Sequence, residues 1–326
     1  MLRQGEDRTR IDALSLRTLL VVPVATCITI GLHFLIAPRE LPHEARTYTI
    51  VLLNFLGGGI VLSLLQRFWT GLRNWMRNMS AIVAAAVLLL GVWEIITAQL
   101  HLLPLPYFPS PAGVAQSLID DRALLFDSTW HSLALLFGGY ALGVIAGLIS
   151  GICIGWSSPI RYWGMPVLKI VGPIPATAWI PLAMVVSPHA LFSAAALIAL
   201  AVWFPVTMLT ASGVQNTRAS YLDVARTLGA RNSYLVFRVA IPAAVPSIFI
   251  GLFMGLGASF LTLVVAESVG VKSGLGWYVS WAQGWAEYGK VFAALIIMAA
   301  FFSTIMTLLF KVRDRVLVWQ KGVIKW

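Results

Sequence analysis

Long apolar stretches separated by short polar segments dominate the pattern of this sequence. A helix that crosses a lipid bilayer needs about 20 mostly apolar residues, and eight stretches approach or exceed that length. They predict an all-α fold, a polytopic transmembrane bundle with about eight spans. The expected spans are residues 18–37, 48–65, 80–100, 130–155, 165–186, 191–212, 242–268 and 291–310.

Composition supports a membrane protein. Hydrophobic residues make up 59% of the 326 residues and charged residues only 11%, which gives more apolar surface than one soluble core of this length buries. Membrane lipid is therefore an expected contact partner for much of the chain.

Basic residues mark one side of the predicted bundle. Most of the 23 Lys and Arg residues lie before the first span, after the second, fourth and sixth spans, and at the C-terminal end. The positive-inside rule makes that side cytoplasmic, so both termini of this multi-pass chain are expected there. The net charge of +10 follows from this topology. No basic patch alternates with aromatic residues, so nucleic acid is not an expected partner.

Three prolines crowd the fifth predicted span. Pro173, Pro175 and Pro181 each remove a backbone donor, so the helix should be broken or kinked there. Irregular backbone at membrane depth often lines a water-filled path, which makes Thr177 and Trp179 candidates for a translocation pathway. A kink that only improves packing is the alternative.

Glycine recurs at every fourth position of the fourth predicted span, and this spacing lets another helix backbone approach closely. Packing within the chain is the expected role, with dimer contact or gating as the alternative. The glycines are Gly139, Gly143, Gly147, Gly151 and Gly155.

Two carboxylates lie inside predicted spans. An ionisable group is costly in a membrane, so Glu94 and Glu267 are functional candidates for the pathway or its gate. A structural hydrogen bond is the alternative for each. They do not form a paired acid and base.

Other chemistry is weakly indicated. Residues Gly284 to Lys290 match the first positions of a phosphate-binding loop, but Val291 stands where a Ser or Thr would hold magnesium. No cluster of Cys and His has the spacing of metal ligands. We expect no metal site, no catalytic residue and no enzyme active site in this chain.

A polar, arginine-bearing loop at about residues 213–241 interrupts the apolar pattern. Ser220 followed by Asp223 has the spacing of a capping box, which predicts a short helix from Tyr221 to Leu228. Gly229 is placed to end that helix in the left-handed conformation.

A second short helix should follow this glycine elbow. Asn232 or Ser233 can cap its beginning, and it would run into Pro242. The loop is thus expected to lay two short helices on the cytoplasmic surface. A plain connector is the alternative.

The same loop resembles the EAA motif of ABC importer permeases. Asp223-Val-Ala225 is followed by three residues, Gly229, nine residues and then Val239-Ala-Ile-Pro242. The spacing matches the family, with Asp in place of Glu and Val in place of the first Ala.

Further blocks in family order extend the resemblance over about residues 79–326, to the permeases of the nitrate, sulfonate and taurine importer family. The blocks are Leu105 to Pro111, Gly172 to Pro181, and Val264 to Glu267 ahead of Ser273 to Gly276. Residues 1–78, an extra pair of helices with a basic linker, lie outside it.

The resemblance implies a six-helix permease core at residues 79–326 and a function. The chain would be a homodimeric permease of the bacterial inner membrane that works with ATPase subunits and an extracytoplasmic solute-binding protein. It would import a small anionic or organic solute of the nitrate, sulfonate or taurine kind. ATP and magnesium would be used by the partner ATPase, and this chain would bind no cofactor.

By the same resemblance, the first short helix of the loop would be the coupling helix that enters a groove of the ATPase. Its coupling residues would be Ser220, Asp223, Ala225, Arg226, Gly229 and Pro242. A self-sufficient secondary carrier or channel is the alternative function, and co-purification with an ATPase would separate the two.

Overall fold

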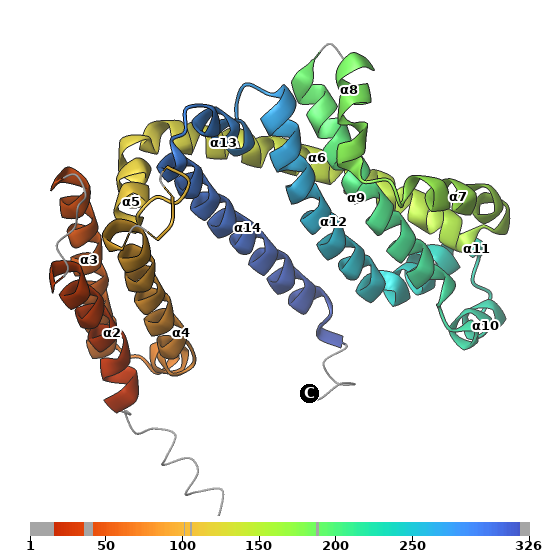
Figure 1. The fold of residues 1–326 in the computed structure, drawn as a ribbon. Helices are drawn as coiled ribbons and strands as arrows, with labels where there is room; N and C mark the ends of the chain where they lie inside the picture. The colour runs from red at the N-terminus through yellow and green to blue at the C-terminus, as the bar shows by residue number, and fades with distance from the viewer. Residues whose placement is uncertain (1–15, 36–41, 101, 105, 187–188, 320–326) are drawn as a thin grey trace, which may run out of the picture. The chain divides into compact units, whose positions relative to one another are not determined.

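The computed structural model describes residues 16–35, 42–100, 102–104, 106–186 and 189–319. These residues form helices and connecting loops, with no strand among them. The first helices are α2 (Leu16–Leu35), α3 (Pro42–Leu65), α4 (Thr70–Glu94), a π-helical turn η1 (Ile95–Gln99), α5 (Pro111–Asp120) and α6 (Arg122–Trp156). The others are α7 (Ser158–Val171), the 3-10 turn η2 (Ala176–Trp179), α8 (Ile180–Val186), α9 (Ala190–Gln215), α10 (Ala219–Thr227), α11 (Asn232–Tyr234), the π-helical segment η3 (Leu235–Ala240), α12 (Ile241–Gly270), α13 (Leu275–Gly284) and α14 (Tyr288–Val316) (Figure 1).

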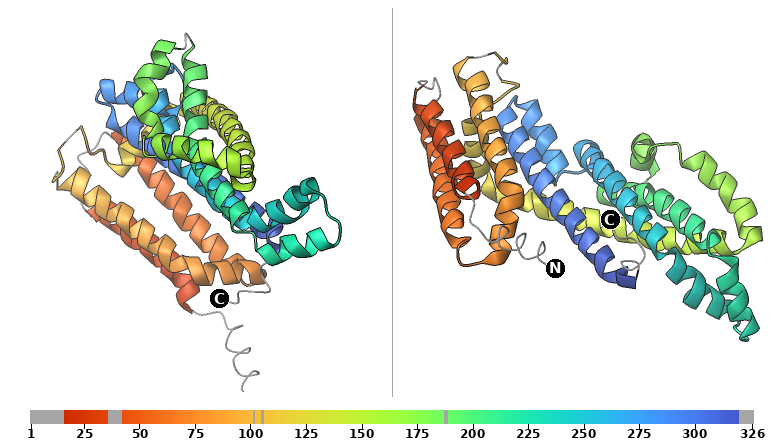
Figure 2. Two further views of the ribbon diagram at one scale, coloured as in Figure 1. Left: turned by 90° about the vertical axis from the view of Figure 1, so that its right-hand side faces the viewer. Right: turned by 90° about the horizontal axis from the view of Figure 1, so that it is seen from below.

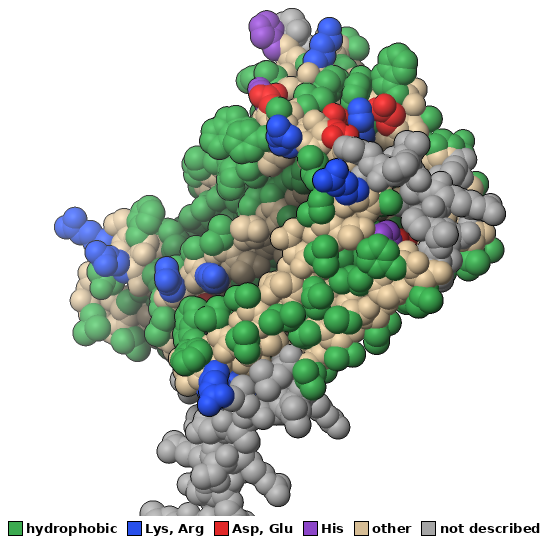
Figure 3. All heavy atoms as spheres, turned by 90° about the vertical axis from the view of Figure 1, so that its left-hand side faces the viewer, with side chains coloured by type: hydrophobic (Ala, Val, Ile, Leu, Met, Phe, Trp, Pro, Cys, Tyr) green, Lys and Arg blue, Asp and Glu red, His purple; other side chains and the backbone are tan. Residues whose placement is uncertain are grey.

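Six helices are long and apolar enough to cross a membrane: Ala45–Leu65, Thr70–Ala98, Arg122–Trp156, Ala190–Gln215, Asn232–Gly270 and Tyr288–Val316. They confirm six of the eight predicted spans. The apolar described part of α2, Leu20–Leu35, is shorter. Hydrophobic side chains cover much of the face shown in Figure 3, as expected of helices that face lipid.

The fifth predicted span is broken, as its prolines predicted. It consists of Ser158–Val171 and Ala176–Val186, which meet at 83°. Pro175 precedes the 3-10 turn η2, and Pro181 lies in the first turn of α8. Proline can occupy the beginning of a helix because the first amides of a helix have no partner inside it.

The chain divides into two compact units. The first unit comprises residues 1–122 and 282–293, and the second comprises residues 123–281 and 294–326. Residue 78, where the extra helices and basic linker were expected to end, lies inside α4. A separate role for residues 1–78 stays a prediction.

Helices α2, α3 and α4 lie side by side in the first unit (Figures 1 and 2). Val22 and Ala25 of α2 pack against Ala84 of α4. Tyr48 and Leu52 of α3 pack against Ala112 of α5. The first unit therefore joins the extra helices to the helices that follow them.

In the second unit, α9 packs against both α6 and α12. A Cβ atom added at Gly151 of α6 would lie 2.6 Å from Cβ of Thr210 on α9. One added at Gly251 of α12 would lie 3.1 Å from Cα of Val206. Tyr140 completes the arrangement, because its hydroxyl donates to the Leu252 carbonyl at 3.0 Å and joins α6 to α12.

All five glycines of the α6 ridge face α9. Their added Cβ atoms would approach Ile198, Ala199, Val206, Thr210 and Val214, respectively, to between 2.5 and 2.8 Å. Real Cβ atoms do not come so close, so this ridge serves packing within the chain. That was the expected role, and dimer contact is not needed to explain it.

The ridge predicts that substitutions at two neighbouring glycines have very different effects on the stability of the protein. Gly139→Val should destabilise the protein by about 2–3 kcal/mol, because the side chain would overlap Ile198. Gly138→Val is the matched control, since nothing lies within 4 Å of its added Cβ. Thermal unfolding in detergent would compare them, and equal melting temperatures would contradict the packing role of the ridge.

Candidate functional site

The polar loop between α9 and α12 is the first candidate site. Helix α10 covers Ala219–Thr227 and is exposed along most of its length. Asp223 and Arg226 form an ion pair of 3.1 Å on its surface. Both side chains are more than half exposed, so this pair adds little stability, and both groups are accessible to a partner.

The predicted capping box is wrong. Helix α10 begins at Ala219, with Arg218 as its N-cap (φ −57°, ψ 128°), and no side chain caps it. Ser220 therefore lies inside the first turn, and the Asp223 carboxylate turns to Arg226. Likewise, Arg231 precedes α11 without a side-chain cap, so neither Asn232 nor Ser233 caps that helix.

The prediction for Gly229 is confirmed. Its φ is +84°, in the left-handed region that glycine adopts without a Cβ clash. The Gly229 amide donates to the Arg226 carbonyl at 2.9 Å, and the Ala230 amide donates to the Ala225 carbonyl at 3.0 Å. This pair of bonds is the Schellman motif, which ends α10 and turns the chain back.

Beyond the elbow, the chain runs directly into the membrane helix. Helix α11, η3 and α12 form one continuous helical segment over Asn232–Gly270. The expected second short helix is thus the first part of a long one. Pro242 follows the π-helical segment and stands in the first turn of α12.

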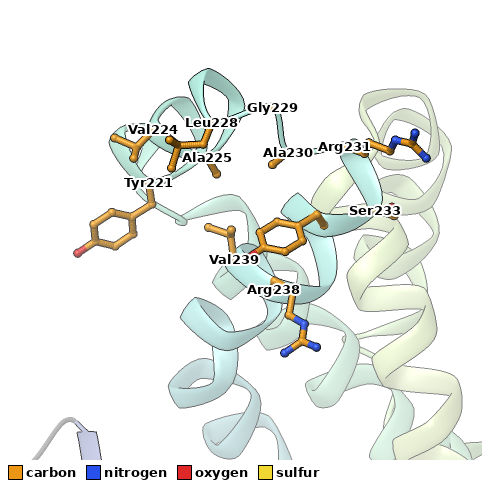
Figure 4. A pocket seen from close by; sticks show the side chains of 11 residues that line it. Tyr221, Val224, Ala225, Leu228, Gly229, Ala230, Arg231, Ser233, Arg238 and Val239 are labelled. Carbon is orange, nitrogen blue, oxygen red and sulfur yellow. The ribbon is translucent and has the colours of Figure 1, made fainter.

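A cavity of about 760 Å³ lies between α10 and the start of this long helix (Figure 4). Its wall on this side is apolar, with Tyr221 and Val224 of α10 and the C-cap residue Leu228 being 53%, 60% and 83% exposed. Arg231 and Arg238 line the other side. The loop thus presents an apolar, positively bordered surface to a partner.

A second cavity, of about 330 Å³, lies where the broken helix meets α9 and α12. Thr177 and Thr262 give it hydroxyl groups, and Phe204 and Leu261 are among its apolar lining. Trp179 is not in the lining. Its indole N–H is buried and has no hydrogen-bond partner among the described residues.

Glu267 lies apart from that cavity and is 1% exposed. Its carboxylate accepts from the Gly276 amide at 2.8 Å and from the Ser132 hydroxyl at 2.8 Å. Ser132 in turn accepts from the Leu275 amide at 2.8 Å. The carboxylate therefore caps the beginning of α13, where negative charge is favourable.

This geometry favours the structural role that the sequence left open for Glu267. Gly274 has a φ of +101°, and a Cβ atom there would overlap the carboxylate. The glycines around Leu275 thus leave room for Glu267. Sequence reasoning missed Ser132 because it lies 135 positions away.

Glu94 belongs to the first unit and is also 1% exposed. Its carboxyl group is hydrogen-bonded to Nδ1 of His33 on α2. It does not line the cavity at the broken helix. The partner could have been sought in the sequence, since His33 is an ionisable residue at the end of a predicted apolar span.

The segment that resembles a phosphate loop has other contacts. Lys290 pairs with Glu287 at 2.7 Å and with Asp121 at 3.3 Å. No strand precedes it in the described part of the chain. Its lysine is therefore engaged with carboxylates at the beginning of α14.

Comparisons with known proteins agree with this architecture. The family model described as "Binding-protein-dependent transport system inner membrane component" matches residues 140–317. An "ABC transporter permease protein" of Haemophilus influenzae is 32% identical over 69% of this chain and 91% of its own length. The taurine transport system permease protein of Escherichia coli is 31% identical over 66% of this chain and 80% of its own length.

Solved structures are similar in fold. A structure of the MetNI methionine ABC transporter in inward-facing conformations superimposes with a TM-score of 0.53 and 17% identity. It covers 60% of this chain and 98% of the matched chain. An amino acid ABC transporter solved with histidines gives a TM-score of 0.51 and 18% identity, covering 64% and 98%.

The cap at α13 yields a prediction. Glu267→Ala should lower the free energy of unfolding by about 2 kcal/mol, because the Gly276 amide and the Ser132 hydroxyl lose their acceptor. Glu267→Gln keeps one acceptor oxygen and should lose less. Thermal unfolding and protease sensitivity near Leu275 would be measured. Full stability with loss of uptake would instead assign Glu267 to the transport path.

Proposed function

Because this chain belongs to the family of binding-protein-dependent transport system inner membrane components, of which ABC importer permeases are members, we propose how its own residues perform transport. Helix α10 is the coupling helix that receives the movement of a separate ATPase subunit. The cavity at the broken helix is part of the path for the solute. The observation that carries the proposal is the exposed helix α10, ended by the Gly229 elbow and continuous with a membrane helix beyond it.

The surface of α10 fits a groove with apolar walls and an acidic border. Tyr221, Val224 and Leu228 recur at helical spacing and are all exposed, which is costly unless a partner covers them. Four arginines and one aspartate lie between residues 216 and 241, so carboxylates at the rim of the partner's groove would speed association. Asp223 and Arg226 border this contact.

The coupling path runs from α10 to α12. Movement of α10 passes through Gly229 to α11 and η3, which lead without interruption into α12. Helix α12 lines the cavity at the broken helix through Ala258 and Thr262. ATP-driven closure of the partner subunits would thus reach the solute path through one helix.

The solute is a small anionic or organic molecule. A taurine permease and a formylaminopyrimidine permease of Halalkalibacterium halodurans, the latter 25% identical over 72% of this chain and 94% of its own length, are among the relatives. The cavity combines apolar side chains with the hydroxyls of Thr177 and Thr262. Such a wall lets a small solute pass without holding it tightly, so selection rests with the solute-binding protein.

The assembly contains other chains. Two copies of this permease, two ATPase subunits and an extracytoplasmic solute-binding protein act together in the bacterial inner membrane, with both termini in the cytoplasm. ATP and magnesium are used by the ATPase, so this chain carries no catalytic residue and binds no cofactor of its own. The permease and its ATPase should co-purify.

Gly229 gives the most direct test of coupling. Gly229→Val should reduce ATPase co-purification and solute-stimulated ATP hydrolysis about tenfold, because a β-branched residue is strained at positive φ. Nothing lies within 4 Å of an added Cβ there, so only the backbone conformation is tested. Gly229→Asn is the control, since Asn tolerates that conformation better. If the Val variant couples normally, α10 is only a connector.

A second prediction concerns the solute path. Ala258 lines the cavity at the broken helix, and Ala258→Trp should fill it. Uptake into proteoliposomes should be lost while the ATPase still co-purifies, because α10 is unchanged. Ala258→Ser, which adds one atom, should retain uptake. Normal uptake by the Trp variant would exclude this cavity from the path.

A further inference from the structure

The first unit contains a buried polar cluster that lines neither the cavity at the polar loop nor the cavity at the broken helix. His33 of α2 is 2% exposed and Glu94 of α4 is 1% exposed. The His33 Nδ1 atom contacts the Glu94 Oε1 atom. His33 Nε2 lies 3.0 Å from the Thr49 hydroxyl of α3. Three helices therefore meet at one imidazole ring.

Both ring nitrogens of His33 have a polar neighbour. The Thr49 hydroxyl lies 3.0 Å from His33 Nε2 and donates to the Ala45 carbonyl at 2.8 Å. The Glu94 carboxyl group contacts the other ring nitrogen, Nδ1. The imidazole is thus held between α3 and α4.

Removing His33 and replacing Glu94 should affect the stability of this cluster to different degrees. An isolated charged carboxylate within a membrane span is expensive, and breaking a buried pair by deleting one partner leaves such a charge uncompensated. Glu94 would be stranded without His33. An amide at position 94 carries no charge and can still form a hydrogen bond with His33 Nδ1.

The surrounding packing keeps α2 close to α4 at the same end. The Thr29 hydroxyl of α2 lies 3.3 Å from the Val87 carbonyl of α4. A Cβ atom added at Gly91 would lie 3.6 Å from Cβ of Thr29. On the other side of the hairpin, the Thr47 hydroxyl of α3 donates to Gln116 of α5 at 2.5 Å.

We propose that the α2–α3 hairpin is a built-in membrane partner of α4, held there by the buried hydrogen-bonded pair of His33 and Glu94. The hairpin supplies the group that permits a carboxylate at position 94 of the first permease helix. Helices α2 and α3 are then an integral part of the first unit, outside the segment that the family model matches. The pair links helices and takes no part in moving the solute.

A disulfide between α2 and α4 would report docking in the full-length chain. Thr29→Cys with Gly91→Cys would place two Cβ atoms within the distance that disulfides require. Cys27→Ala and Cys153→Ala would remove the natural cysteines of the described chain. The variants would be oxidised in native membranes, and the cross-linked fraction and the melting temperature in detergent would be measured.

His33→Leu should lose most of the cross-linked product and lower the melting temperature by roughly 5–10 °C, because Glu94 is stranded. His33→Leu combined with Glu94→Leu should recover both values. Glu94→Gln should stay close to the original chain. The control is His131→Leu, since His131 forms an exposed pair with Asp127 and should change neither value.

Several results would overturn the proposal. Unchanged cross-linking and melting for His33→Leu would mean that the pair does not hold the hairpin. If the double Leu variant behaves as badly as His33→Leu, lost packing and not a stranded charge is the cause. A large loss with Glu94→Gln would mean that a hydrogen bond to His33 is not enough to hold the hairpin. Co-purification of the ATPase is recorded separately, so failure of coupling through α10 remains distinguishable.

Discussion

The close approach of three backbones at α9 is the constraint on which the second unit depends. In a membrane, lipid is as apolar as the side chains, so helices gain little from burying apolar surface against each other. Close packing must therefore supply the free energy of helix association. This packing energy increases as the helix backbones approach each other. Glycines on α6 and α12 permit that approach at Thr210 and Val206. The broken helix and the polar loop are both attached to helices of this group, which holds the two candidate sites in place.

Much of this arrangement could be predicted from local features of the sequence. The lengths of the apolar stretches predicted the six spans that the structure contains, and the prolines predicted the break after Val171. Gly229 was recognisable because only a left-handed residue can end α10 and reverse the chain there. Each of these features depends on a few neighbouring residues, so no distant contact was needed.

Features that depend on chain direction or on distant residues were not predictable. Ser220 and Asp223 have the spacing of a capping box, but the helix begins at Ala219 with Arg218 as its N-cap, so Ser220 lies inside the first turn. The partners of the two buried carboxylates are Ser132, 135 positions from Glu267, and His33, 61 positions from Glu94. The sequence identifies both carboxylates as costly to bury in a membrane. Only the fold shows their partners, which are the Gly276 amide and the Ser132 hydroxyl for Glu267 and the imidazole for Glu94.

The helical segment over Asn232–Gly270 has 39 residues and is about 58 Å long. The π-helical η3 and Pro246 lie in its first part. A proline inside a helix removes one backbone hydrogen bond and favours a bend, so the part of α12 beyond Pro246 can tilt relative to η3. The break between α7 and α8 contains Pro173 and Pro175, neither of which has a backbone N–H to donate. Because η2 packs against α12, the angle at Pro246 sets where the two walls of the cavity at the broken helix meet.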